Sequence, residues 1–345
     1  MKKLLYTVVA LCALAVAMPQ TALAQVKKPI VNYHNNADAY IARQAEETFA
    51  VVDAALDAYP PIVGKSIERR ISLYCLDQLL HDTRNDNSES FQAYLQSRTS
   101  KLLAELKKPV KSGMTVFKIY NEAFIAKTKD VTIAFDIVRG RSKGMPIVPE
   151  ALLTQIVKKC DVLFLTHNHG DHVDRWVANQ FIAAGKPVIA TNQILANVAG
   201  VTHFRDDYMM IQKQVKTKKG KVLNVRIYPG HQGANLENNV YAVTTPDGFT
   251  VAHTGDQHYR PDMSWIANVK NDTPQIDALI INCWTYKLPL AIEGFNPRYV
   301  FTGHENEMGH SIDHREAFWL TFSKLQEVKH DYIVTSWGEW FHIEK

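Results

Sequence analysis

The chain has 345 residues, enough for one large domain or two modest ones, and its composition of 46% hydrophobic and 21% charged residues is ordinary for a soluble globular protein. The formal net charge of +4 is small for this length, so charge does not indicate nucleic acid as a partner. Four cysteines without a C-x-x-C spacing indicate neither a zinc ribbon nor a redox motif.

The first 24 residues have the pattern of a secretory signal peptide. Lys2 and Lys3 precede an apolar run that extends to about residue 18, and residues 22–24 (Ala-Leu-Ala) form a cleavage pattern. We expect cleavage before Gln25, which lowers the net charge to +4 − 2 = +2 and leaves a periplasmic or secreted protein with no stable membrane span. The alternative is a membrane anchor, which the shortness of the apolar run disfavours.

Residues 25–110 are predicted to form a helical extension. Apolar residues recur at helical spacing in segments 37–59, 67–80 and 88–106, and Pro60 and Pro61 end the first of them. No constellation of metal ligands or nucleophiles stands out in this region. We interpret it as helices packed on the following domain, with a cap over an active site as the alternative.

Residues 111–345 are predicted to form an α+β domain, because from Thr115 the apolar pattern changes to that of short strands. A first hairpin turns at Lys129 and Asp130. Further strands are expected at 162–165, 187–190, 222–228, 240–245, 250–253, 278–283, 299–302, 332–334 and 339–343, and helices at 149–158, 174–185, 192–198 and 311–325. This order fits two sheets packed face to face and covered by helices.

A cluster of polar residues follows the apolar run at 162–165. His167, His169, Asp171 and His172 stand within six positions, and neutral imidazole and carboxylate are ligands for zinc, iron or manganese. The alternation of His167 and His169 puts two imidazoles on one side of an extended turn, while Asp171 and His172 point to a second position. The turn can therefore serve two metals, although histidines at strand ends also occur as solvated polar residues.

The sequence pattern T-H-x-H-x-D-H after an apolar strand resembles the signature of the metallo-β-lactamase superfamily. The remaining ligand motifs of that superfamily follow in order, with His231, Asp256 and His304 each placed after an apolar or alternating run. The resemblance extends from about Thr115 to the C-terminus. It implies a four-layer αββα sandwich that carries the N-terminal helical extension.

The resemblance also implies a ligand set for two divalent metal ions. One ion would be held by His167, His169 and His231, the other by Asp171, His172 and His304, with Asp256 bridging them. Zinc is expected, with manganese or iron as alternatives. Two such ions lower the pKa of a shared water and make it the nucleophile, with Asp171 and Asp256 as the catalytic carboxylates.

The implied enzyme is a hydrolase. An Asp at the bridging position, Asp256, disfavours a true β-lactamase and suits hydrolases of thioesters, lactones and phosphodiesters. The sequences of segments 248–256 and 296–300 are most similar to those of the ascorbate-6-phosphate lactonase-like branch, which includes N-acyl phosphatidylethanolamine phospholipases. We therefore expect a secreted dinuclear hydrolase of a small ester, lactone or phosphodiester, with no nucleic acid as partner. A nuclease-type phosphodiesterase and a non-catalytic metal-binding protein are the alternatives.

Other polar residues near these motifs are candidates for supporting roles. His253 stands three positions before Asp256, so in a strand it faces the opposite side, and a structural hydrogen-bonding role is favoured over a catalytic one. Several residues soon after His304 are candidates to orient ligands or contact substrate, or else to form a solvated helical turn. These are Glu305, Glu307, His310 and His314.

Overall fold

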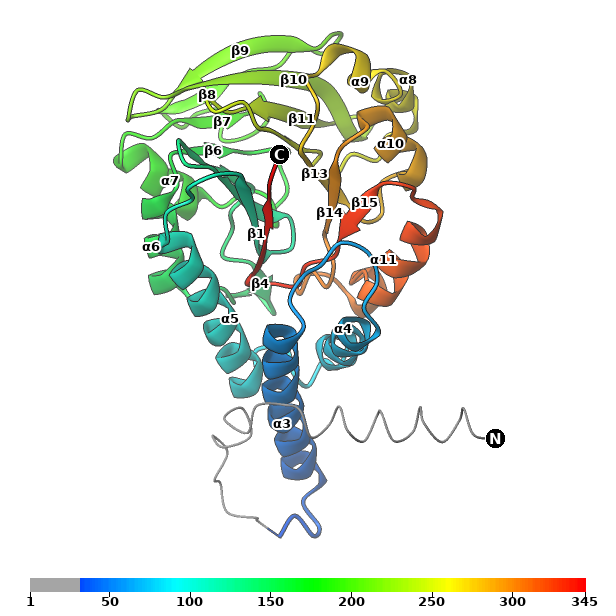
Figure 1. Cartoon of the computed structure of the whole chain (residues 1–345). Coiled ribbons are helices and arrows are strands. Elements are labelled where there is room, and N and C mark those ends of the chain that lie inside the picture. The colour runs from blue at the N-terminus through cyan, green and yellow to red at the C-terminus, as the bar shows by residue number, and fades with distance from the viewer. Residues whose placement is uncertain (1–31) are drawn as a thin grey trace.

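The computed structural model describes residues 32–345, so the predicted signal peptide lies outside the described residues. Two large β-sheets lie face to face, with helices on their outer sides and three further helices at the N-terminal end (Figure 1). Within residues 32–345, no helix combines the length and the apolar character needed to cross a bilayer.

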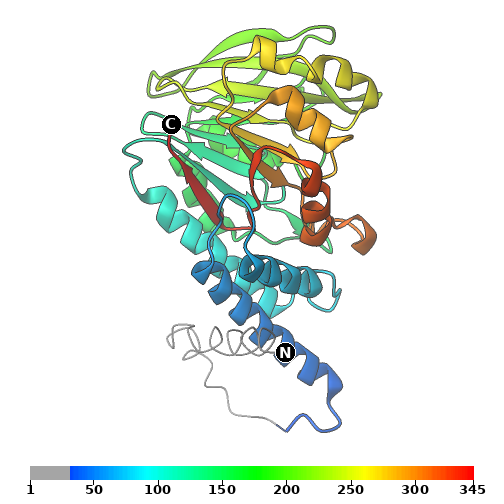
Figure 2. The same ribbon diagram turned by 45° about the vertical axis from the view of Figure 1, so that its right-hand side comes forward.

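The three predicted N-terminal helices form close to their expected bounds. They are α3 (Ala37–Ala58), α4 (Ile67–Leu80) and α5 (Glu89–Lys107). Each begins after a residue whose side chain accepts a hydrogen bond from the first helical turn, namely Asn36, Ser66 and Ser88. Phe49 of α3 packs on Phe91 of α5, and α3 projects beyond the sheets (Figure 2).

The first sheet has seven strands and contains both the first and the last strand of the chain. Its order is β16 (Glu339–Ile343), β1 (Met114–Tyr120), β2 (Ala123–Lys127), β3 (Thr132–Phe135), β6 (Val162–Phe164), β7 (Val188–Ala190) and β8 (Val201–His203). The strands from β16 to β3 are antiparallel, and those from β3 to β8 are parallel. A separate small ribbon pairs β4 (Arg141–Ser142) with β5 (Met145–Pro146).

The second sheet repeats this division into an antiparallel and a parallel half. Its order is β15 (Asp331–Ile333), β14 (Tyr299–Gly303), β13 (Ala278–Asn282), β12 (Thr250–His253), β11 (Leu236–Thr244), β10 (Val222–Gly233) and β9 (Ile211–Lys216). The strands from β9 to β12 are antiparallel, and those from β12 to β15 are parallel.

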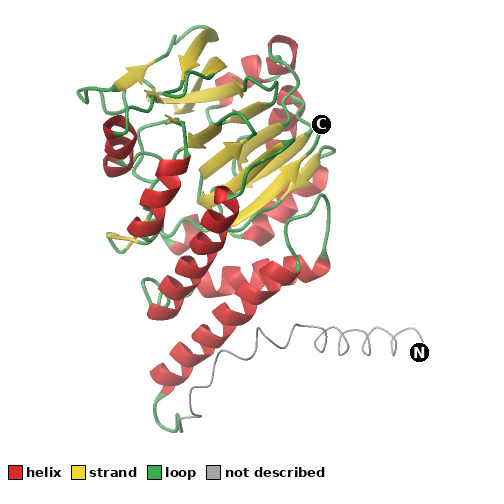
Figure 3. Cartoon of the chain, turned by 60° about the vertical axis from the view of Figure 1, so that its left-hand side comes forward, coloured by secondary structure: helices red, strands yellow, loops and turns green. Residues whose placement is uncertain are grey.

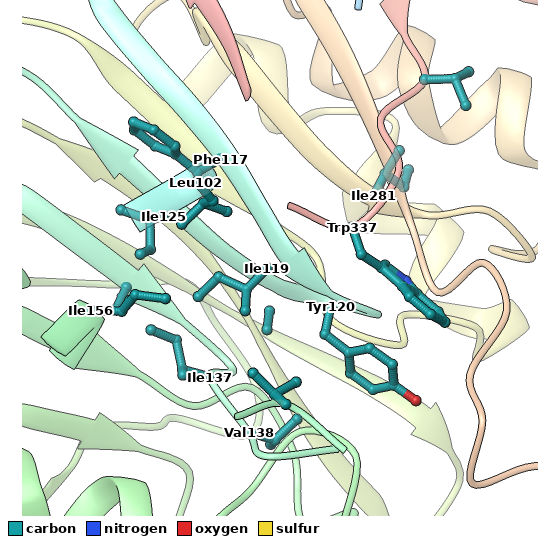
Figure 4. Close-up of a cluster of buried hydrophobic side chains, with 14 of the residues drawn as sticks. Leu102, Phe117, Ile119, Tyr120, Ile125, Ile137, Val138, Ile156, Ile281 and Trp337 are labelled. Carbon is teal, nitrogen blue, oxygen red and sulfur yellow. The ribbon is translucent and has the colours of Figure 1, made fainter. Parts of the chain in front are cut away.

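The core lies between the sheets and beneath the helices. Across the inner faces, Phe164 of β6 packs on Tyr241 of β11, and Phe135 of β3 stacks on the His253 ring, each pair with ring centres 5.0 Å apart. The first sheet is covered by α5, α6 (Glu150–Lys159) and α7 (Arg175–Ala183), and Figure 4 shows Leu102 of α5 and Ile156 of α6 against its outer face.

The second sheet is covered by short helices from the later half of the chain. They are α8 (Met263–Ile266), α9 (Val269–Asp272), α10 (Leu288–Phe295) and α11 (Phe318–Lys324), with the 3-10 turns η1 (Arg260–Asp262), η2 (Ile312–His314) and η3 (Leu325–Glu327). The layers are helix, sheet, sheet and helix, as Figure 3 shows by colour. This is the predicted α+β four-layer sandwich.

Two helix predictions were wrong. Residues 192–198 form turns, in which Leu195 adopts a φ of 49°, a left-handed conformation that a helix does not tolerate. The helix predicted at 311–325 begins only at Phe318. Its first backbone N–H groups are bound by the Asp77 carboxylate of α4, a contact that the local pattern does not reveal.

Candidate metal centre

The predicted ligands lie at one edge of the sandwich, at the carboxyl ends of strands. His167 follows β6 of the first sheet, while Asp256 follows β12 and His304 follows β14 of the second. The two sheets are joined here, because the Asn239 N–H donates to the Thr166 carbonyl at 2.8 Å and His167 pairs with Asn238 as a β-bridge. Residues nearly 140 positions apart are thereby brought to one place.

Two groups of potential ligands lie at this edge and share one residue. In each group the ligand atoms lie within 4.8 Å of one another. The members are His167, His169 and Asp256 in the first group, and Asp171, His172, Asp256 and His304 in the second. Asp256 therefore occupies the position expected of a bridging ligand. Within residues 32–345, the two groups contain all the predicted metal ligands except His231.

The second group is compact. Oδ2 of Asp171 lies 3.4 Å from Nε2 of His172 and 3.4 Å from Nε2 of His304. Oδ1 of Asp256 lies 3.3 Å from Nε2 of His172, and its Oδ2 lies 3.6 Å from Nε2 of His304. Atoms that bind one ion tetrahedrally at about 2.1 Å are about 3.4 Å apart. The spacing fits a single metal ion between these four side chains.

The buried imidazoles of the two groups all leave Nε2 free for a metal. Nε2 of His167, of His172 and of His304 is buried and has no hydrogen-bond partner among residues 32–345. Such atoms are rare in folded proteins, because leaving a buried polar atom unsatisfied costs about 1–3 kcal/mol. A bound cation would satisfy all three nitrogens, so the donor set fits divalent metal ions.

The Asp136 carboxylate, at the end of β3, orients two of these rings. Its Oδ2 lies 2.8 Å from Nδ1 of His172 and accepts from the Thr166 hydroxyl at 2.5 Å, while its Oδ1 accepts from the Thr166 N–H at 2.8 Å. The same hydroxyl lies 3.2 Å from Nδ1 of His167. A carboxylate on Nδ1 keeps the proton there and leaves Nε2 as the metal-binding atom.

The carboxylates and imidazoles shift one another's ionisation. Burial alone would raise the pKa of Asp256, but His172 and His304 lower it below its ordinary value. Burial likewise opposes the charged form of His304, yet Asp256 and Asp171 raise its pKa to about 9. Burial lowers the pKa of His167 to about 3. The two carboxylates thus favour a positive charge at this buried point, which a bound cation would supply in place of the His304 proton.

Three amide side chains that the sequence analysis did not single out fix Asp256. Its backbone N–H donates to Oδ1 of Asn238 at 3.0 Å. Its Oδ1 accepts from Nδ2 of Asn282, and its Oδ2 accepts from Nε2 of Gln232 at 3.1 Å. Asn282 ends an apolar strand, a signal that could have indicated it; Asn238 and Gln232 carry no comparable signal.

His231 stands beside the groups but is held differently. Its Nδ1 lies 3.1 Å from Oδ2 of Asp262, the arrangement that orients metal-binding histidines. Its Nε2 lies 2.9 Å from Nη2 of Arg205, whose guanidinium also contacts Asn239 at 3.1 Å. Because an arginine N–H can only donate, it occupies the lone pair that a metal would use. His231 can bind a metal only when Arg205 moves away.

His253 has the hydrogen-bonding surroundings of a structural histidine. Its Nε2 lies 3.0 Å from the Glu122 carbonyl, and its Nδ1 accepts from the Gly255 N–H at 3.0 Å. Both ring nitrogens are therefore used within the protein. The Glu122 carboxylate, 3.4 Å from the same Nε2, is buried without a hydrogen-bond partner among the described residues, and burial together with the charge of Asp256 raises its pKa well above the usual range.

The four polar residues after His304 have different surroundings. The Nε2 atom of His310 lies 4.0 Å from Oδ2 of Asp171, which places this half-buried ring at the rim of the site. Glu307 is buried, and burial and the charge of Asp171 raise its pKa to about 8. Glu305 is paired with buried Lys118 and accepts from the Thr321 hydroxyl.

His314 is 74% exposed at its side chain and contacts Asp313, so it lies outside the ligand groups.

Aromatic rings line the rim of the ligand groups. The Trp284 ring centre lies 5.4 Å from that of His304, and the His258 ring packs on Trp284 at 5.0 Å. His169 is exposed beside His167, with ring centres 4.7 Å apart, so the first group opens to solvent.

No model of a known protein family matches the sequence, and no curated protein sequence matches it. The structure resembles that of Igni18, a novel metallo hydrolase from the archaeon Ignicoccus hospitalis, with a TM-score of 0.50, 17% identity, and coverage of 68% of this chain and 100% of that one. It also resembles a possible metal-dependent hydrolase from Veillonella parvula, with a TM-score of 0.50, 14% identity, and coverage of 67% and 100%. At these identities the likeness shows the fold, which is the metallo-β-lactamase sandwich.

Proposed function

We propose that the protein is a metal-dependent hydrolase with a dinuclear centre. The observation that carries this proposal is the convergence of three unpartnered imidazole nitrogens on the Asp256 carboxylate, with Asp171 beside two of them, at spacings that match the edges of a metal coordination shell. The fold likeness to structures described as metal-dependent hydrolases supports it.

Each ligand group would hold one ion. His167, His169 and Asp256 would bind the first, with His231 as a fourth ligand once Arg205 is displaced. Asp171, His172, Asp256 and His304 would bind the second. Zinc suits this mixture of imidazole and carboxylate, and manganese or iron would also be accepted.

When bound, the metal ions supply Lewis acidity, which acidifies water and polarises the bond to be cleaved. The protein's own residues perform the remaining tasks. Asp256 holds both ligand groups at a fixed separation, because Asn238 and Asn282 fix its backbone and carboxylate. Trp284 and His258 form an aromatic wall at the rim against which an organic substrate can lie.

We propose a small ester, lactone or phosphodiester as substrate. A water nucleophile would suffice for these classes, and the open first group leaves room for a substrate beside His169. The similarity to the ascorbate-6-phosphate lactonase-like branch rests on the sequence motifs at 248–256 and 296–300 alone. The predicted signal peptide supports action in the periplasm or outside the cell.

A substrate panel tests the proposal. Purified zinc-loaded protein should hydrolyse at least one member of a set of aryl esters, acyl lactones and bis-aryl phosphodiesters, and chelator treatment should abolish that activity. Added zinc should restore it. Activity that survives complete metal removal would contradict the proposal. Cleavage of single-stranded nucleic acid in preference to every small-molecule substrate of the set would indicate a nuclease in place of the proposed substrate class.

A further inference from the structure

The segment that carries His304 has a strained backbone. The His304 loop, residues 304–317, joins β14 to α11 and carries His304, Glu307 and His310. His304 and Asn306 adopt left-handed φ angles of 72° and 59°. Such conformations cost free energy in non-glycine residues and persist only where the surrounding structure holds them. Contacts from outside the loop must therefore keep His304 in place.

One set of contacts comes from α4 of the helical extension. The buried Asp77 carboxylate accepts from Nδ2 of Asn306 at 2.9 Å, and from the backbone N–H groups of Phe318 and Trp319 at 2.9 and 3.2 Å. Asn306 stands two residues after His304, while Phe318 and Trp319 begin α11. Asp77 therefore fixes both ends of the His304 loop, and Figures 1 and 2 show α4 beside α11.

A second set of contacts comes from a buried guanidinium. Nε of Arg315 donates to the His310 carbonyl, and its Nη1 and Nη2 donate to the Leu80 and Met308 carbonyls and to both oxygens of Asp86. All five N–H donors of this arginine are thus used. They tie two loop carbonyls to the end of α4 and to the turn before α5.

A third contact supports the loop from beneath. The Tyr120 hydroxyl at the end of β1 accepts from the Met308 N–H at 2.8 Å. The Tyr120 ring packs on Trp337 at 4.8 Å, as Figure 4 shows, and Trp337 packs on Phe91 of α5 at 6.4 Å. The extension therefore reaches the loop through both α4 and α5.

We propose that the N-terminal helical extension is a positioning element of the metal centre. Through Asp77 and the Arg315–Asp86 ion pair, it holds the His304 loop in the strained conformation that directs His304 toward the other ligands of the second group. This inference rests on the proposed metal-binding function. Asp77 acts through Asn306 and is a positioning residue, since it does not touch the ligands themselves.

The test is a zinc titration of chelator-treated protein by calorimetry. The Asp77→Ala substitution should weaken the second metal by about tenfold or more, and leave the first metal, whose ligand group lacks His304, unchanged. Asn306→Gly should have the same effect, because glycine adopts the left-handed conformation freely but lacks the amide. The double variant should bind no more weakly than Asp77→Ala, because that substitution already removes the contact with Asn306.

A matched control separates positioning from stability. Asp53 of α3 contacts Arg98 and Lys101 of α5, within the extension and away from the His304 loop. Asp53→Ala should lower the melting temperature but retain both metals with wild-type affinity. If Asp77→Ala does not fold, Asn306→Gly decides the question.

Two results would overturn the inference. One is that folded Asp77→Ala or Asn306→Gly protein binds both metals as wild type does. The other is that Asp53→Ala weakens the second metal to the same extent. A wild-type protein that binds no zinc at all would instead refute the proposed function, so the two failures are distinguishable.

Discussion

Nδ1 of His172 lies 2.8 Å from Oδ2 of Asp136, a residue that belongs to neither ligand group. The carboxylate keeps the imidazole proton on Nδ1 and leaves Nε2 free to face Asp171 and Asp256. Asp136 also accepts both polar hydrogens of Thr166, the residue before His167. One side chain at the end of β3 thereby orients ligands of both groups.

The first prediction concerns a substitution at Asp136 that removes the carboxylate charge and retains the size of the side chain. Asp136 has a φ of 45°, and asparagine tolerates that conformation, so Asp136→Asn leaves the backbone unstrained. We expect metal affinity to fall by about tenfold to a hundredfold. Asp161→Asn is the control, because Asp161 accepts from the Thr132 N–H at the start of β3 and contacts Lys219. Equal metal affinities in the two variants would show that Asp136 does not orient the ligands.

The second prediction concerns His231. Because Asp262 orients its ring, we expect Nε2 to bind the first metal once Arg205 is displaced. His231→Ala should therefore weaken the first metal by about tenfold or more, as measured by competition with a chelator. Unchanged affinity would mean that Arg205 keeps this nitrogen and that the ligand role taken from the motif resemblance is wrong.

The third prediction is a pH dependence of stability in the metal-free protein. Burial raises the pKa of Glu307 from 4.5 to about 8, so the folded protein keeps a proton that the unfolded chain loses above pH 4.5. The contribution of Glu307 to stability should therefore fall as pH rises from 4.5 to 8. Glu307→Gln mimics the protonated form and should be more stable than wild type by up to about 4 kcal/mol at pH 8, with little difference below pH 4.5. Urea unfolding across this range measures the difference, and a constant offset would contradict the assignment.

The fourth prediction compares a substitution of Asp256, which should impair catalysis, with a substitution of His253 in β12, which should impair stability. Asp256→Asn removes the negative charge that both ligand groups share, and hydrolysis should fall by about a hundredfold or more. His253→Ala removes a ring whose two nitrogens bind the protein, so it should lower stability by about 2–4 kcal/mol and spare turnover per folded, metal-loaded molecule. The comparison is made at matched metal occupancy. Near-normal turnover in Asp256→Asn protein would mean that Asp256 does not bridge the metals.

Much of the fold and part of the site could be predicted from the sequence, because both depend on local patterns. The apolar run before His167 and those before Asp256 and His304 mark strand ends, and the carboxyl ends of parallel strands share one sheet edge. The periodicity of α3, α4 and α5 is likewise local.

The remainder depends on contacts between distant segments. Asp77 caps α11 from 241 residues away, so no local signal shows that the helix starts at Phe318. The Arg205–His231 contact arises only when the loop after β8 meets the end of β10, and the motif alone could not reveal it. Glu305 and His314 are candidates by their closeness to His304 in sequence, but the contact of Glu305 with Lys118 and the exposure of His314 depend on how the loop folds, which the sequence does not show.

Elemental analysis of the purified protein tests the central claim most directly. Two ligand groups that share Asp256 predict about two divalent metal ions per chain, with zinc as the principal element, under metal-replete conditions. His172→Ala and His304→Ala should each reduce the count to about one, because each removes a ligand of the second group alone. A count near zero in metal-replete wild-type protein would contradict the account.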